Sequence, residues 1–166
     1  MCIRDRDYNQ AIRLNPDSVS YSNRGITYHA LKQFDRAIAD YNQAIYLDPN
    51  KANAYINRGK TYHALKQFDR AIADYNQAIY LDPNKANAYH LRGRSYYALE
   101  QFDRAVADYN QAIYLNPNDA IAYSLRAVIY LFDLKQVQKG CNDLEKACNL
   151  GVCDNYKLVI KEGKCF

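Results

Sequence analysis

Tryptophan is absent from this 166-residue sequence, and methionine, proline and glycine are scarce, with one, four and six copies. No apolar run approaches the roughly 18 to 20 residues that a transmembrane helix requires. Residues 1–7 contain no hydrophobic signal region. The net charge of +4 is spread along the chain without a run of like charges. These absences argue against a membrane span in this chain and against nucleic acid as its partner.

Motifs typical of enzymes are also missing. The three histidines, His29, His63 and His90, have no recurrent acid, serine or cysteine partner for nucleophilic catalysis. There is no glycine-rich phosphate loop and no His-Glu-x-x-His motif. The cysteines include no Cys-x-x-Cys pair, which argues against a zinc site. The sequence therefore predicts a protein that is not an enzyme and uses no metal or cofactor.

The sequence is rich in repetition. Residues 27–51 are identical to residues 61–85, and residues 86–119 follow the same 34-residue frame. A fixed period of this length is typical of a stacked array. In each repeat two stretches carry small and aromatic residues at spacings of three and four, which predicts two amphipathic helices, and a proline ends the second. Most of the 17 tyrosines recur at positions 4, 11, 24 and 29 of successive repeats, and these recurring tyrosines are interpreted as core residues.

The repeat also has a recognisable set of landmarks. With Ala52 as position 1, it has an aromatic residue at 4, Gly at 8, Tyr at 11, Ala at 20, Tyr at 24, Ala at 27 and Pro at 32. In these features it resembles the tetratricopeptide repeat (TPR), in a fragment of a bacterial-type multi-repeat chain. The resemblance implies an all-α, right-handed α-solenoid of stacked antiparallel helix pairs.

The repeat frame divides the chain, and the start does not fit a complete repeat. The first half-dozen residues depart from the frame, so we expect a truncated or foreign start that hides any leader or anchor. The predicted parts are a partial leading repeat with only its second helix (1–17), three full repeats (18–51, 52–85 and 86–119), a degenerate fourth (120–151), and a cysteine-containing capping helix and tail (152–166).

Position 7 carries arginine, where the family usually has a large aliphatic residue, and position 23 carries aspartate. A half-buried guanidinium without a carboxylate partner would be costly, so we expect the two to pair across helices. The alternative is that Arg58 anchors an anion. The expected structural ion pairs join Arg24, Arg58, Arg92 and Arg126 to Asp40, Asp74, Asp108 and, after a one-residue insertion near Asp133, Asp143.

Four cysteines lie in the C-terminal section: Cys141, Cys148, Cys153 and Cys165. Cys141 and Cys148 are seven residues apart and share one helix face. If the capping helix folds back, Cys153 lies near Cys148 and Cys165 near Cys141. The hypothesis is two disulfides; the alternative is four buried or unpaired thiols. Disulfides would favour a periplasmic or secreted location over a cytoplasmic one.

The repeats differ mainly on the first helix. The second and third repeats differ at positions 5, 6, 9, 10, 12, 15, 21, 31 and 34. Positions 2, 5, 9 and 12 form one stripe on a helix, and the resemblance implies that this stripe lines the concave wall of the superhelix. The predicted peptide-binding groove comprises Asn53, Ile56, Asn57, Lys60, His63, Asn87, His90, Arg94 and Tyr97.

Three functions compete on this evidence. The first is a protein–protein interaction scaffold that binds a peptide or protein segment, with some acidic character, in the groove. The second is a structural or self-associating spacer that uses the open edge near residues 7–14. The third, an RNA-binding helical repeat, is disfavoured because position 9 reads Ile26, Lys60, Arg94 and Val128, which is not a regular basic pattern. The carboxylate clamp of some family members is only partly matched, by Asn57.

Overall fold

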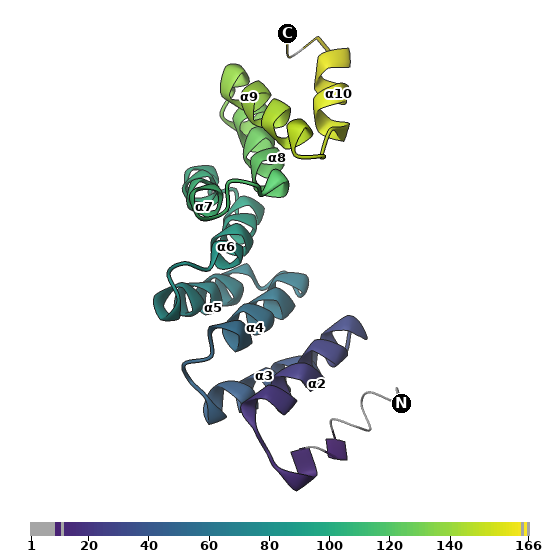
Figure 1. The fold of residues 1–166 in the computed structure, drawn as a ribbon, viewed down its shortest axis with the longest axis vertical. Coiled ribbons are helices and arrows are strands. Elements are labelled where there is room, and N and C mark those ends of the chain that lie inside the picture. The colour runs from purple at the N-terminus through teal and green to yellow at the C-terminus, as the bar shows by residue number, and fades with distance from the viewer. Residues whose placement is uncertain (1–8, 11, 164, 166) are drawn as a thin grey trace. The chain divides into compact units, whose positions relative to one another are not determined.

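A computed structural model describes residues 9–10, 12–163 and 165 of the chain. Residues 1–8 and 11, which hold most of the predicted partial leading repeat, lie outside the described residues. The chain divides into two compact units, residues 1–83 and 84–166. All regular elements of the described residues are helical, and successive helices pair within each unit, as Figure 1 shows.

The first unit contains two helix pairs. Helix α2 (Ser18–Ala30) packs on α3 (Phe34–Leu47), and α4 (Ala52–Ala64) packs on α5 (Phe68–Leu81). Helix α3 also packs against α4, so the second pair is stacked on the first. The second unit contains α6 (Ala86–Ala98), α7 (Phe102–Leu115), α8 (Ala120–Val128), the π-helical turn η1 (Ile129–Asp133), α9 (Val137–Asn149) and α10 (Asp154–Lys161).

The pairs pack closely because position 8 has no side chain. A Cβ atom placed on Gly59 would lie 2.7 Å from Cε1 of Tyr75, a ring that is fully buried. Gly25 meets Tyr41 at the same distance. Glycine is a poor helix former, by roughly 1 kcal/mol relative to alanine. The cost is offset because the tyrosine at position 24 can lie directly against the first helix.

The interpretation of every repeated tyrosine as core is wrong at position 29. Tyr46, Tyr80 and Tyr114 are about four-fifths exposed, whereas the tyrosines at position 24 are buried. Position 29 is five residues beyond position 24, which turns it about 140° around the helix and away from the partner helix. The tyrosines at positions 4 and 11 are half-buried.

The π-helical turn marks the inserted residue of the fourth repeat. Arg126 and Asp143 are 17 residues apart, one more than the equivalent residues of the earlier repeats, and they still pair. A π-helical turn takes one extra residue into a helix without breaking it. The insertion therefore changes the helix locally and keeps the register of the next helix.

One backbone feature of the turn inside each repeat gives a stability prediction. Lys32, Lys66, Glu100 and Lys135 have positive φ angles of 58°, 59°, 58° and 56°. This left-handed conformation costs an L-residue roughly 1 kcal/mol, and glycine adopts it freely. We expect Lys66→Gly to raise the free energy of unfolding, by up to about 1 kcal/mol, in urea denaturation. Ala73→Gly, at an exposed position inside helix α5, is the control and should lower it. A loss in both variants would contradict the prediction.

Candidate functional site

The predicted arginine–aspartate pairs are the most regular polar feature of both units. In the second repeat, Arg58 Nε donates to Asp74 Oδ2 at 2.9 Å and Nη2 to Oδ1 at 2.6 Å. The other three pairs, Arg24–Asp40, Arg92–Asp108 and Arg126–Asp143, have the same two-bond geometry with distances of 2.6 to 2.8 Å. Each pair lies within one repeat, between its first and second helices. The guanidinium at position 7 is thus occupied by protein groups.

These arginines also tie neighbouring repeats together. Arg58 Nη1 donates to Asn42 Oδ1 of the preceding repeat at 2.6 Å, and Arg126 makes the equivalent bond to Asn110 at 2.5 Å. The Arg58 guanidinium carbon lies 5.6 Å from the centre of the Tyr55 ring. With its donors directed at a carboxylate and an amide, Arg58 is set up as a structural group, which disfavours the alternative of an anion anchor.

The groove residues of the first unit lie on α4. Asn53 and Lys60 are exposed, and Asn57 and His63 are half-buried. Lys60 is close enough to His29 of α2 to lower the pKa of that imidazole, although burial is the larger cause. We call Asn53, Asn57, Lys60 and His63 the α4 face.

The inclusion of Ile56 in the groove is wrong. Ile56 is 4% exposed and packs inside the first unit. It lies four residues after Ala52 and three before Gly59, which are both buried, so the three share one helix face. Ser22 and Ser124, at the same position of their repeats, are also buried.

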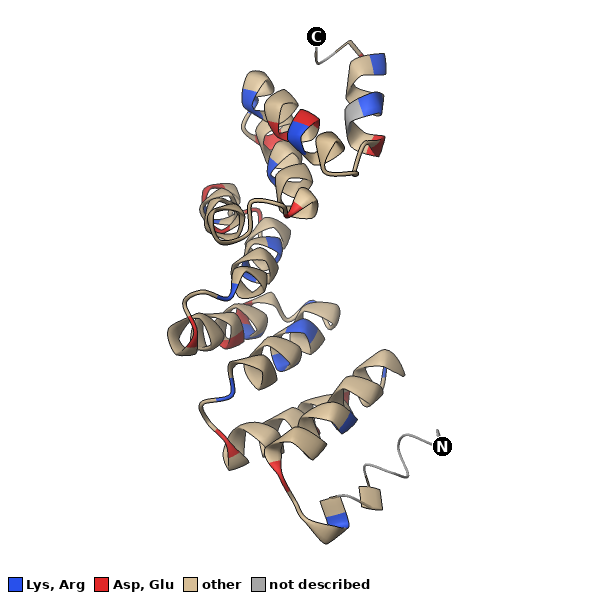
Figure 2. Ribbon diagram, viewed as in Figure 1, with Lys and Arg blue, Asp and Glu red and all other residues tan. Residues whose placement is uncertain are grey.

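The groove residues of the second unit lie on α6. Asn87, Arg94 and Tyr97 are exposed, whereas His90 is half-buried. We call these four residues the α6 face. Figure 2 shows basic and acidic residues interspersed on the helices of each unit. The positive charge of Arg94 is therefore a local one.

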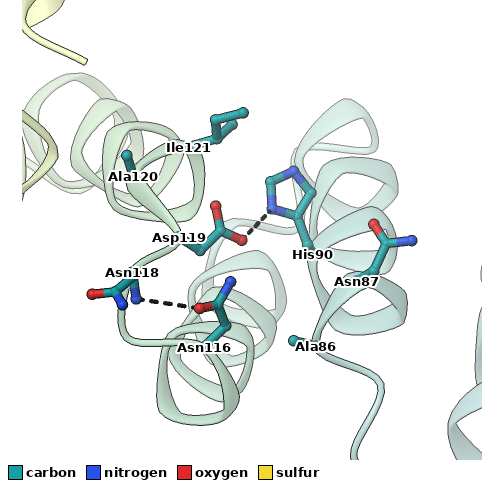
Figure 3. Close-up of a pocket in the computed structure, with 8 residues that line it drawn as sticks. All are labelled: Ala86, Asn87, His90, Asn116, Asn118, Asp119, Ala120 and Ile121. Atoms are coloured by element: carbon teal, nitrogen blue, oxygen red, sulfur yellow. Dashed lines mark hydrogen bonds and ion pairs between the residues drawn. The ribbon is translucent and has the colours of Figure 1, made fainter. Parts of the chain in front are cut away.

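A pocket opens beside this face, between the starts of α6 and α8. Its volume is about 600 Å³, and Figure 3 shows its lining: Ala86, Asn87, His90, Asn116, Asn118, Asp119, Ala120 and Ile121. The His90 imidazole and the Asp119 carboxylate approach to 3.3 Å between Nδ1 and Oδ2. Asp119 Oδ1 also accepts from the Ala122 backbone N–H at 3.0 Å and thereby caps α8.

The predicted groove includes Asn87 and His90 but not the pocket residues that come from the turn, Asn116, Asn118 and Asp119. The sequence does single out two of them, because Asn116 and Asp119 are at positions 31 and 34, which differ between the second and third repeats. The predicted stripe follows the first helix alone and therefore omits them. Turn residues do not follow helical periodicity, so their convergence on His90 requires the fold.

Two histidines lie in surroundings that disfavour their charged form. Burial lowers the pKa of His90; Asp119 opposes this shift, and Arg94 adds to it. Burial also lowers the pKa of His29, whose Nδ1 lies 2.9 Å from Thr61 Oγ1. The Thr61 hydroxyl donates to the Asn57 carbonyl, which leaves its oxygen to accept from His29. Both imidazoles are therefore neutral at neutral pH.

These shifts predict that the protein becomes less stable in mild acid. Below the ordinary histidine pKa of about 6.5 the unfolded chain binds protons that the folded chain resists, so the free energy of unfolding declines as pH falls. Urea denaturation at pH of about 7.5 and about 5.5 measures the decline. His29→Tyr, which introduces the residue found at this position in the third repeat, should show a smaller decline than the parent. An equal decline would contradict the prediction.

The C-terminal cysteines are joined as two disulfides, Cys141–Cys165 and Cys148–Cys153. Val159 of α10 is buried against a cluster that includes Leu131 and Leu144. Among the described residues no group of three or more His, Cys, Asp or Glu side chains could hold a metal ion. None of the helices that the structure describes has the length and apolar character to cross a membrane.

Comparison with known proteins agrees with this architecture. The family model for the TPR repeat matches residues 25–66 and 93–131, and the tetratricopeptide repeat model matches residues 52–85. The chain belongs to the tetratricopeptide repeat family. Its fold is that of a protein–protein interaction module.

Several solved structures are similar to the chain. The crystal structure of MamA has a TM-score of 0.80 at 23% identity, over 88% of this chain and 85% of that one, which shows the shared fold. The first TPR domain of Spaghetti (RPAP3), bound to the HSP90 peptide SRMEEVD, has a TM-score of 0.68 at 29% identity, over 69% and 91%. The Arabidopsis OM64 TPR domain has a TM-score of 0.62 at 30% identity, over 63% and 87%.

Proposed function

We propose that this chain is a scaffold that binds extended segments of a partner protein, with the α4 face as a binding surface of the first unit and the α6 face as a binding surface of the second. The observation that carries the proposal is the exposure of Lys60, Arg94 and Tyr97, on helices whose other faces are packed. Positions 9 and 12 are also where the nearly identical repeats differ. An exposed cation and exposed amides suit a peptide backbone and an acidic side chain. The acidic peptide bound by the similar Spaghetti domain supports such a partner.

The test measures binding of the full 166-residue chain to an array of peptides of about 12 residues, sorted by charge. Lys60→Ala tests the α4 face, and Arg94→Ala with Tyr97→Ala tests the α6 face. Tyr80→Ala is the matched control, because Tyr80 is 81% exposed on α5 and lies on neither face. We expect the parent and the control to bind the same peptides, and each face variant to lose about tenfold in affinity, the loss of one charge-assisted contact.

Two outcomes would oppose the proposal. Peptide binding that is lost in Tyr80→Ala and retained in the face variants would move the site to the second helices. Absence of peptide binding, together with a mass in size-exclusion chromatography that rises with protein concentration, would favour the self-associating spacer instead. The family is generally non-catalytic, which agrees with a scaffold.

The proposal extends to the compartment in which the scaffold works. The two disulfides suit an oxidising environment such as a periplasm or the cell exterior, because thiols in the cytosol are kept reduced. Mass spectrometry of alkylated native protein tests this point. Four free thiols in protein taken directly from its compartment would contradict an oxidising location and leave the peptide-binding proposal standing.

A further inference from the structure

The pocket beside the α6 face is built where the third repeat departs from the second. His90 stands where the second repeat has Ile56, and Asp119 stands where it has Lys85. Both residues line the pocket and contact one another. Asn116, a third lining residue, replaces an aspartate of the preceding repeat. The substitutions therefore converge on one place and give the third repeat a polar cavity.

The pair of His90 and Asp119 holds the carboxylate in place without sealing it. Asp119 Oδ2 accepts a hydrogen bond from His90 Nδ1–H, and Oδ1 accepts one from the Ala122 N–H. The side chain is therefore held from two sides. The Asp119 side chain is still 19% exposed. Each carboxylate oxygen has a second lone pair that can accept from a ligand. Asp119 is thus an oriented, reachable anion.

The rest of the lining adds acceptors and no cation. Asp119 is the one residue of the lining that carries a full charge when His90 is neutral. Because His90 donates through Nδ1, its Nε2 is an acceptor, on the side of the ring away from Asp119 (Figure 3). Asn87 and Asn118 add amide groups. Ile121 is 56% exposed and supplies an apolar wall beside these groups.

We propose that this pocket binds the basic side chain of a lysine or arginine in the partner segment. The ammonium or guanidinium group would lie against Asp119 and the amide oxygens, and the methylene stem would lie along Ile121, as the stems of long cationic side chains do on apolar surfaces. This inference rests on the proposed peptide-binding function and names the chemistry of one residue of the peptide.

Arg94 adds a condition on the neighbouring part of the peptide. It lies four residues after His90 on α6, is exposed, and does not line the pocket. A basic side chain in the pocket would be repelled by Arg94 unless an acidic group of the same peptide stood beside it. The segment should therefore carry a basic residue followed or preceded at short range by an acidic one, and such complementarity gives specificity.

The test is an NMR titration of the full chain with small probes of matched shape. Nα-acetyl-lysine methylamide is the probe, and its side-chain ammonium group is free. The Nα-acetyl methylamides of glutamine and glutamate are its neutral and acidic counterparts. Methylammonium supplies the charged group without the rest of the residue. We expect the lysine probe to shift the resonances of His90 and Asp119 at lower concentration than the other three. Asp119→Asn, which retains an oxygen to cap α8, should weaken the lysine probe at least tenfold, as expected for loss of an ionic hydrogen bond.

A second variant guards against an effect of misfolding. The double substitution His90→Ile with Asp119→Lys gives the third repeat the residues of the second, which the same fold accepts at those positions. It should keep the thermal midpoint within a few degrees and abolish binding of the lysine probe.

The outcomes separate the two proposals. Lysine binding that survives Asp119→Asn, or a glutamate probe that binds equally well, would overturn the basic-side-chain site. Equal binding of methylammonium and the lysine probe would show a site for free amines and not for a peptide side chain. Lysine binding without any binding on the peptide array would retain the pocket and reject the peptide-binding function.

Discussion

Arg58→Ala is expected to lower the free energy of unfolding by about 3 kcal/mol, because it leaves the Asp74 carboxylate buried without its cation. Asp74 is 5% exposed, and both of its oxygens accept from Arg58. The substitution also removes the bond to Asn42 and the guanidinium beside the Tyr55 ring. The loss is therefore much larger than the 0 to about 1 kcal/mol typical of a surface ion pair.

The pH dependence of this loss identifies its cause. Burial already raises the pKa of Asp74, while the hydrogen bonds and charge of Arg58 lower it. Without Arg58 the pKa of Asp74 should rise further. A raised carboxyl pKa means that the folded state binds the proton more readily than the unfolded state, so stability recovers as pH falls towards the folded pKa. We expect the difference between Arg58→Ala and the parent to be largest at neutral pH and to shrink in acid.

A double variant provides the control for Arg58→Ala. Arg58→Met with Asp74→Leu removes both charges and retains apolar volume, so it should be more stable than Arg58→Ala alone. Urea denaturation of the parent, Arg58→Met, Asp74→Leu and the double variant forms a thermodynamic cycle. A loss below about 1 kcal/mol for Arg58→Ala, independent of pH, would show that solvent screens the pair.

The sequence was sufficient to predict features that repeat in register. The glycine at position 8 allows the two helices of a repeat to pack closely, and the proline at position 32 ends the second helix. The helix pairs could therefore be predicted from the repeat pattern. The register of Arg58 with Asp74 followed from the same frame, because the pair recurs in each repeat. Even the insertion near Asp133 was visible, since Asp143 is displaced by one residue.

Features that depend on the environment of a side chain were harder to predict from the sequence. Tyrosine at position 29 looks like tyrosine at position 24, and only the angle between them on the helix separates an exposed ring such as Tyr80 from a buried one such as Tyr75. The groove prediction is wrong at Ile56 for a related reason, because a position that varies between repeats can still be buried. Lys66 has a left-handed backbone conformation, which the sequence does not indicate because the residue is not a glycine.

The second large effect is expected at the C-terminal cap. Replacing Cys141 and Cys165 with alanine removes a bond between residues 24 positions apart, and the loop-closure model assigns such a bond about 3 kcal/mol. Cys148 and Cys153 are only five positions apart, so loss of that bond should cost less. The anchors of α10 that remain include the Cys148–Cys153 bond at its start, the burial of Val159 and the hydrogen bond from Asn155 Nδ2 to Ser124 Oγ at 2.9 Å.

Hydrogen exchange locates this loss within the chain. Because α10 packs on α9 within the second unit, the double cysteine variant should lose amide protection in α10 first, while α2 to α5, which belong to the first unit, keep theirs. Loss of the cap would expose Leu131 and Leu144, which Val159 covers, so binding of an apolar dye should rise. Protection of α10 that is equal in the variant and the parent would show that the other anchors hold the cap, and that the bond between Cys141 and Cys165 contributes little to it.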